Sequence, residues 1–197
     1  MSPLLQFLLL VIISYFLGGL PNGKWIADLK GVNILEVGSG NIGAANVNRA
    51  LGPRFAGIVL ALDAAKGFFP TLVAQGAFQT DWMVCGVALA AFLGHIFSPF
   101  LRFKGGKGVS TYLGVLLAIA PLPTIVVFLI GIIAVWAVRV TSLVDLVLFL
   151  FAVPMLYYFA SPHYAAFGII IWGLLIYTHR SNIERLLSGN ELRIFGS

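Results

Sequence analysis

Seven long apolar stretches, spread from one end of the chain to the other, constrain this sequence more than any other feature. Lys, Arg, Asp and Glu make up only 10% of its 197 residues, whereas hydrophobic residues make up 60%. Soluble domains usually contain about 25% charged residues, and a soluble fold of this length lacks the interior to bury so many apolar side chains. We therefore expect an all-α, polytopic transmembrane helix bundle that forms one domain over residues 1–197.

A membrane-spanning helix needs roughly 20 apolar residues. Several of the stretches are shorter, which membrane proteins accommodate by snorkelling side chains and a locally thinner bilayer. Pro121 and Pro123 indicate a tight turn between two short helices rather than one kinked helix. The first stretch lacks the features of a cleaved signal peptide, so we expect it to be retained. The seven predicted spans are Leu4–Leu20, Phe55–Gln75, Met83–Leu101, Val109–Ala120, Thr124–Val138, Leu143–Ala160 and Tyr164–Thr178.

The distribution of basic residues predicts the orientation of these spans. Lys and Arg occur in every second connection and after the last span, and only Lys66 lies within a span. The connections Gly76–Trp82, Pro121–Pro123 and Ser161–His163 contain neither residue. Since basic loops remain in the cytoplasm, we expect the N-terminus outside and the C-terminus in the cytoplasm. The same distribution accounts for the net charge of +5, so we expect no nucleic-acid partner.

The first basic loop, Val37–Arg49, is rich in glycine and asparagine and contains Gly-x-Gly-x-x-Gly. A dinucleotide fold is excluded, because the following helix enters the membrane and no parallel sheet can form. Glycine-rich backbone before a helix still directs N–H groups at an anion, and an arginine fork suits phosphate. The alternative is a plain turn with an ordinary cytoplasmic arginine. The candidate phosphate-binding residues are Ser39, Gly40, Asn41, Asn46 and Arg49.

The second basic loop follows the third span and places two lysines around a Gly-Gly pair, just before a helix begins. It is not a Walker A loop, because Lys107 is followed by Gly108 rather than Ser or Thr, and no strand precedes it. We interpret it as a second anion-binding loop. The alternative is a set of lysines that anchor lipid headgroups. The candidate binding residues here are His95, Lys104, Gly105, Gly106, Lys107 and Ser110.

The third polar element, Thr178–Glu191, lies at the inner end of the last span. His179 and Glu184 mimic the H-x4-D pattern of soluble glycerolipid acyltransferases. On a continuous helix, however, residues five apart are about 140° round the axis, whereas His179 and Asn182 share a face. We expect His179, Asn182 and Glu184 to form a catalytic wall, with His179 as a candidate base. The alternative is an amphipathic helix end.

Two further features lie in or beside the spans. Asp63 and Lys66 are three residues apart in the second span, where a lone charge costs about 2.5–3.5 kcal/mol. We expect them to face the bundle interior and to pair, as a structural or site-supporting group. Ser142, in the short turn before the sixth span, is a candidate binding residue, and a plain turn is the alternative. No loop has His, Cys, Asp or Glu at metal-ligand spacing, so we expect no metal and no cofactor.

The three polar elements together resemble a known family. GSGNIGAANVNR, GHIFSPFLRFKGGKGVST and THRSNIERLLSGNE are similar to the three cytoplasmic motifs of the PlsY family, the bacterial acyl-phosphate:glycerol-3-phosphate acyltransferases, and LDAAKG in the second span also fits. Ser98 is inserted between a Phe and a Pro that are adjacent in the family pattern. Length, span order and motif order agree, so the resemblance covers almost the whole chain.

This resemblance implies an enzyme of the bacterial inner membrane with its active site on the cytoplasmic side. It implies transfer of a fatty acyl group from acyl phosphate to the 1-hydroxyl of sn-glycerol 3-phosphate, which yields lysophosphatidic acid and phosphate. An acyl phosphate is already activated, so no covalent acyl-enzyme is expected. The hydroxyl proton goes either to His179 or to a substrate phosphate oxygen. The alternatives are acyl-CoA as donor, a transporter or channel for an organic phosphate, and a scaffold subunit.

Overall fold

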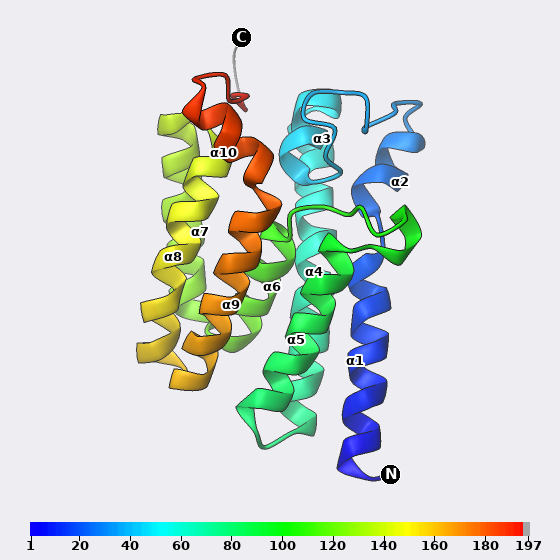
Figure 1. The fold of residues 1–197 in the computed structure, drawn as a ribbon, viewed down its shortest axis with the longest axis vertical. Coiled ribbons are helices and arrows are strands. Elements are labelled where there is room, and N and C mark those ends of the chain that lie inside the picture. Colours follow the sequence, from blue (N-terminus) through cyan, green and yellow to red (C-terminus); the bar gives the residue numbers. More distant parts are fainter. Residues whose placement is uncertain (195–197) are drawn as a thin grey trace.

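The structure is a computed structural model that describes residues 1–194, and helices make up its regular structure (Figure 1). The described part of the chain contains no strand, so the all-α prediction is confirmed. The helices are α1 (Pro3–Gly19), α2 (Asn22–Asp28), α3 (Ala44–Leu51), α4 (Pro53–Ala77), α5 (Asp81–Ile96), η1 (Pro99–Leu101), α6 (Val109–Ile119), α7 (Pro121–Val138), α8 (Thr141–Phe159), α9 (Pro162–Thr178) and α10 (Arg180–Leu187).

Prolines mark the starts of several apolar helices. Pro3, Pro53, Pro121 and Pro162 each lie in the first turn of a helix, where the missing N–H is not needed and φ is already suitable. Because α6 ends at Ile119 and α7 begins at Pro121, the chain forms two short helices here. The predicted division into two short helices is therefore confirmed, although both prolines lie in the first turn of α7 rather than in the connection.

Seven of the helices in residues 1–194 are apolar, namely α1 and α4 to α9. Five helical stretches are long and apolar enough to cross a membrane: Pro3–Asp28, Pro53–Ala77, Asp81–Leu101, Pro121–Val138 and Thr141–Phe159. The other two apolar helices, α6 and α9, are shorter. The predicted helix positions thus agree with the structure, whereas length and composition alone support five spans.

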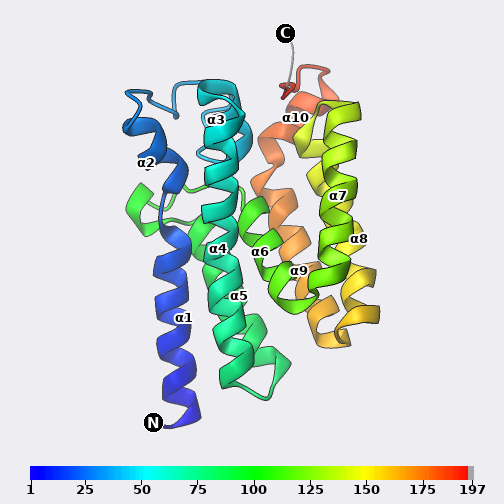
Figure 2. The ribbon, with the colours of Figure 1, turned by 180° about the vertical axis from the view of Figure 1, so that it is seen from behind.

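The helices run roughly parallel to one long axis, with the N-terminus and α10 at opposite ends (Figures 1 and 2). The short polar helices α2, α3 and α10 gather at the end opposite the N-terminus. Within the bundle α1 packs on α5, α4 on α6 and α8 on α9, while α7 packs against α6 and α8. Every basic loop predicted to be cytoplasmic therefore lies toward the same end.

Two glycines bring α4 and α6 into close contact. A Cβ at Gly67 would overlap the carbonyl oxygen of Thr111, and one at Gly114 would overlap that of Ala64. Small residues of this kind let helix backbones approach closely in membrane proteins. This contact places the start of α6, and the glycine loop before it, beside the polar face of α4.

Candidate active site

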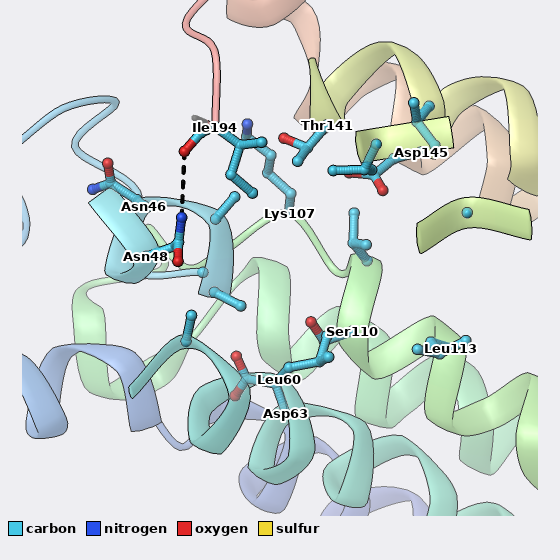
Figure 3. Close-up of a pocket in the computed structure, with 18 of the residues that line it drawn as sticks. Asn46, Asn48, Leu60, Asp63, Lys107, Ser110, Leu113, Thr141, Asp145 and Ile194 are labelled. Carbon is cyan, nitrogen blue, oxygen red and sulfur yellow. Dashed lines mark hydrogen bonds between the residues drawn. The ribbon is translucent and has the colours of Figure 1, made fainter. Parts of the chain in front are cut away.

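A cavity of about 460 Å³ lies between α4, α6, α7 and α8, below the polar helices (Figure 3). Its polar end is lined by side chains from the first loop and α3, by Lys107 and Ser110, and by Asp145 of α8. Its other end, here called the apolar arm, is lined by aliphatic and aromatic side chains, among them Leu60 and Leu113. The cavity therefore joins a polar, cationic region to an apolar one.

The first loop is shaped by the buried amide of Asn46. Its Oδ1 accepts from the backbone N–H of Ser39 at 2.9 Å. Its Nδ2 lies within hydrogen-bond distance of the carbonyl oxygens of Ile34, Val37 and Asn41, at 3.2, 2.9 and 2.9 Å. Asn46 therefore uses its polar atoms within the loop, although it also lines the cavity. Its predicted bond to a substrate stays a prediction.

The loop also depends on two glycines in the left-handed region, Gly38 at φ 58° and Gly40 at φ 65°. The carboxamide oxygen of Asn41 accepts from the Gly43 N–H at 2.9 Å, just before α3 begins. Ser39 and Asn41 line the main cavity, whereas Gly40 lines a separate hollow. The predicted phosphate-binding residues of this loop are therefore divided between two hollows, with the side chains of Ser39 and Asn41 at the main cavity.

Arg49 of α3 lines the cavity and is held by the C-terminal segment, residues 191–194. Its Nε and Nη2 donate to the carbonyl oxygens of Arg193 and Leu192 at 3.1 and 3.2 Å. Asn48 donates to the carbonyl oxygen of Ile194 at 3.3 Å (Figure 3). Burial lowers the pKa of Arg49, while the nearby Glu191 carboxylate raises it. The C-terminal segment thus passes beside the polar end of the cavity and fixes the guanidinium there.

The two lysines of the second loop, Lys104 and Lys107, line two different hollows. Arg102 and Phe103 adopt left-handed backbone, at φ 52° and 61°, and the chain turns at these residues. Lys107 lines the main cavity, whereas the exposed Lys104 lines the separate hollow with Gly40 and Gly105. The structure therefore does not bring Lys104 and Lys107 to one site, and a phosphate role for Lys104 stays a prediction.

The ammonium of Lys107 lies in a partly desolvated position. Burial lowers the pKa of Lys107 to about 8. The carboxylates of Asp145 and Glu191 raise this pKa, but their effect is smaller than that of burial. The carbonyl oxygen of Lys107 accepts from the hydroxyl of Thr178 at 3.0 Å, which ties the glycine loop to the end of α9. Ser110, buried in the first turn of α6, also lines the cavity.

The third element brings Asn182, but not Glu184, to the cavity. Asn182 is 3% exposed, and its Nδ2 donates to the Glu191 carboxylate. Its Oδ1 is buried and has no hydrogen-bond partner in residues 1–194. A buried acceptor without a donor is costly, so this atom is suited to a ligand hydroxyl. Glu184 lies on the exposed face of α10.

The carboxylate that organises this region is Glu191, which the sequence analysis did not assign. Its Oε2 accepts from Arg185 at 2.9 Å, and its Oε1 accepts from Ser142 at 3.1 Å and from Asn182. Gly189, at φ 73°, follows α10 where the chain turns back toward the cavity. Gly189 was the available signal for this reversal. Ser142, predicted to bind substrate, lies behind Glu191 and does not line the cavity.

His179 is 1% exposed and lies behind the cavity wall rather than in it. Its Nδ1 is 2.8 Å from the carbonyl oxygen of Leu175. Because a carbonyl only accepts, Nδ1 carries the proton and Nε2 keeps a free lone pair. Nε2 is 4.0 Å from Oδ2 of Asp145, which lines the cavity. Burial, and secondly the charge of Lys107, lower the pKa of His179 to about 4. The imidazole is therefore neutral at physiological pH.

Asp63 and Lys66 form the buried ion pair expected from their spacing, with Nζ 2.7 Å from Oδ1. Asp63 and the buried His95 also line the cavity. This places the charged pair of α4 directly beside the glycine loop that carries Lys107.

The comparisons with known proteins agree over nearly the whole chain. A family model described as glycerol-3-phosphate acyltransferase matches residues 8–189. The glycerol-3-phosphate acyltransferase of Aquifex aeolicus is 44% identical over 189 residues, which covers 94% of this chain and 98% of that protein. The one from Geotalea daltonii is 40% identical over 186 residues, which covers 93% and 95%.

Two solved structures share the fold. PlsY, described as an integral membrane glycerol 3-phosphate acyltransferase, matches in its glycerol 3-phosphate form with a TM-score of 0.92 and 42% identity, over 97% of this chain and 96% of that one. Its lysophosphatidic acid form matches with a TM-score of 0.89 and 43% identity, over the same shares.

The helix bundle, with basic glycine loops at one end of a partly apolar cavity, defines an integral membrane enzyme of the acyltransferase class. With the family match and these relatives, the chain belongs to the glycerol-3-phosphate acyltransferase family, the PlsY family. The resemblance drawn from its three polar motifs is confirmed.

Proposed function

We propose that this protein transfers a fatty acyl group from an acyl phosphate to the 1-hydroxyl of sn-glycerol 3-phosphate. The observation that carries the proposal is a single cavity with a cationic polar end and an apolar arm. The reaction needs both, because phosphate groups and a hydroxyl must meet the head of a fatty acyl chain. The names of the relatives and of the PlsY structures support glycerol 3-phosphate as the acceptor.

At the polar end, Lys107 and Arg49 are the cationic groups for phosphate, with Ser39, Asn41 and Ser110 as neutral donors. The Oδ1 of Asn182, which has no hydrogen-bond partner within residues 1–194, accepts from a glycerol hydroxyl. Charge-assisted hydrogen bonds of this kind contribute about 1.5–3 kcal/mol each. Together these groups hold the acceptor while the acyl carbonyl is placed beside it.

The apolar arm suits the acyl chain. It is lined by Leu60 of α4, Leu113 of α6 and Phe128 of α7. Ile132 and Trp136 of α7 line the cavity and are also exposed, at 51% and 76%. The cavity therefore opens beside α7, on the face that would meet lipid, and an acyl donor dissolved in the bilayer can enter there.

The chemistry requires no acyl-enzyme. The glycerol hydroxyl oxygen attacks the acyl carbonyl carbon, the new ester bond forms, and the bond to the phosphate oxygen breaks. Lys107 stabilises the charge that develops on the leaving phosphate. The hydroxyl proton passes to Nε2 of His179 or to a phosphate oxygen. The single cysteine, Cys85, is buried in α5 and does not line the cavity.

The donor is tested with purified protein in detergent or nanodiscs. We expect lysophosphatidic acid to form from glycerol 3-phosphate and acyl phosphate, with one phosphate released per product, and no turnover with acyl-CoA alone. Turnover with acyl-CoA alone would overturn the donor assignment. Uptake of labelled glycerol 3-phosphate into proteoliposomes without product would instead indicate a transporter.

No metal takes part in this scheme, and residues 1–194 contain no cluster of His, Cys, Asp and Glu that could hold one. We expect full activity in the presence of EDTA, because leaving-group charge is met by Lys107. The measurement is initial rate with and without chelator. Loss of activity that a divalent ion restores would contradict this prediction.

The proposed topology is one domain of seven spans in a bacterial inner membrane, with the N-terminus outside and the active site facing the cytoplasm. Thr80, directly before α5, and Ser188, directly after α10, are exposed. The start of α5 and the end of α10 lie toward opposite ends of the bundle (Figure 1). In a Cys85→Ala background, we expect a membrane-impermeant maleimide to label Thr80→Cys from outside and Ser188→Cys only after lysis. Equal labelling of both from outside would refute the topology.

A further inference from the structure

The buried ammonium of Lys66 has one acceptor atom for each of its three N–H groups. Its Nζ lies 2.7 Å from Oδ1 of Asp63, 2.7 Å from the carbonyl oxygen of Leu20 and 3.1 Å from Nδ1 of His95. The Lys66 side chain is 6% exposed and that of Asp63 is 2% exposed. An ammonium has three N–H donors and no lone pair, so each of its hydrogens is assigned to one of these atoms.

This arrangement decides the protonation of His95. Nδ1 faces a group that can only donate, so Nδ1 must be the acceptor and the ring proton must lie on Nε2. An imidazolium would place a second cation 3.1 Å from the ammonium. Asn22 donates to the same Asp63 oxygen at 3.1 Å, which keeps the carboxylate committed to Lys66.

The Nε2 side of the ring faces the glycine loop. His95 is 4% exposed and lines the cavity, and Nε2 has no hydrogen-bond partner within residues 1–194. A Cβ at Gly106 would overlap Nε2, so only glycine allows the loop to pack this closely against the nitrogen. The backbone N–H of Gly106 donates to the His95 carbonyl oxygen at 3.1 Å, which joins the histidine to the loop that carries Lys107.

We propose that Lys66 is a positioning residue that holds His95 as the Nε2–H tautomer, and that this N–H donates to a phosphate oxygen of one of the two substrates. The proposal rests on the proposed function for the identity of those substrates. It adds a neutral donor on the α4 side of the cavity, next to the cationic Lys107. It also gives the charged pair of α4 a role in binding as well as in packing.

The tautomer is tested by ¹⁵N NMR of the full-length protein labelled at histidine. The chain has three histidines, and His95→Gln identifies the His95 signals. We expect His95 to show a protonated Nε2 and an unprotonated Nδ1, whereas His179, bonded to the Leu175 carbonyl through Nδ1, shows the opposite pattern. A protonated Nδ1 on His95 would overturn the proposal. This readout needs no turnover, so it stands apart from the proposed function.

The role of Lys66 is tested by Lys66→Met, and by Lys66→Met with Asp63→Asn, which avoids leaving a buried unpaired carboxylate. We expect His95 to become a mixture of tautomers in either variant. Lys24→Met is the matched control, because Lys24 forms an exposed pair with Asp28, and it should leave the His95 signals unchanged. A single Nε2–H tautomer in the double variant would remove the positioning role.

Kinetics decide which phosphate His95 contacts. We expect His95→Leu to raise the KM for either glycerol 3-phosphate or acyl phosphate by about tenfold or more. His95→Gln, which keeps a donor near the Nε2 position, should recover most of that loss. The Lys66 variants should raise the same KM and add little in combination with His95→Leu. Unchanged KM values for both substrates in His95→Leu would refute the phosphate contact.

Discussion

Replacing Lys107 with Met is expected to lower kcat/KM by about 10²–10³-fold. Lys107 is the ammonium that lines the cavity from the second loop, and preorganised cationic donors act strongly where charge develops in a water-poor site. Methionine keeps the length and apolar stem of the side chain, so the loop is preserved. The measurement is steady-state kinetics with each substrate varied in turn.

The matched control for this variant is Lys30→Met. Lys30 is exposed and stacks over the ring of Phe55 at 5.0 Å, away from the cavity. It should leave the kinetics unchanged. A Lys107→Met enzyme with kinetics like those of the control would exclude Lys107 from the site.

The lowered pKa of Lys107 also predicts the pH dependence. Its cationic form binds phosphate, and that form is lost as pH rises through about 8. The profile of kcat/KM should therefore fall above pH 8, and Lys107→Arg should remove this fall because arginine stays charged. A profile that is flat through pH 9.5 in the unaltered enzyme would contradict the assignment.

Replacing His179 with Ala is expected to lower kcat by about 100-fold if its Nε2 accepts the hydroxyl proton. Nδ1 is bound to the Leu175 carbonyl, so Nε2 is the free basic nitrogen beside Asp145. Because the pKa of His179 is lowered to about 4, the neutral form persists down to that pH. The acid limb of the kcat/KM profile, which reports the free enzyme, should thus lie well below 6.5.

His163→Ala is the control for the His179 variant. His163 lies at the opposite end of the bundle, half-exposed, with Nδ1 3.3 Å from Asp81, and its loss should leave kcat unaltered. A His179→Ala enzyme with near-normal kcat at saturating substrate would exclude the base role. A substrate phosphate oxygen would then be the proton acceptor.

Much of the fold was predictable because its determinants are local. Apolar runs, prolines at helix starts and the break at Pro121 depend on neighbours within one or two turns. The ion pair of Asp63 and Lys66 followed from their spacing on one helix, because residues three apart share a face. Helix geometry also indicated that His179 and Glu184 face apart, and Glu184 is exposed, although all three residues of this element were expected in the catalytic wall.

The candidate site was predictable only in outline. The three motifs indicated phosphate chemistry, but not which side chain reaches the cavity. Lys104 and Lys107 are three residues apart, and the left-handed backbone at Arg102 and Phe103 lies in the turn before Lys104. Non-glycine residues rarely adopt that conformation, so the sequence did not predict this turn.

The sequence by itself determined that the chain folds in lipid, where its helices lie and which polar residues are available for chemistry. Composition, apolar runs and chain breaks can be recognised without knowing the tertiary structure. Only the tertiary structure decided that Glu191 rather than Glu184 lines the cavity, that Asp145 lines it too, and that Lys66 contacts His95. These contacts join residues brought together from different helices or through a chain reversal. They depend on side-chain direction in irregular loops and on helix packing, which sequence spacing does not encode.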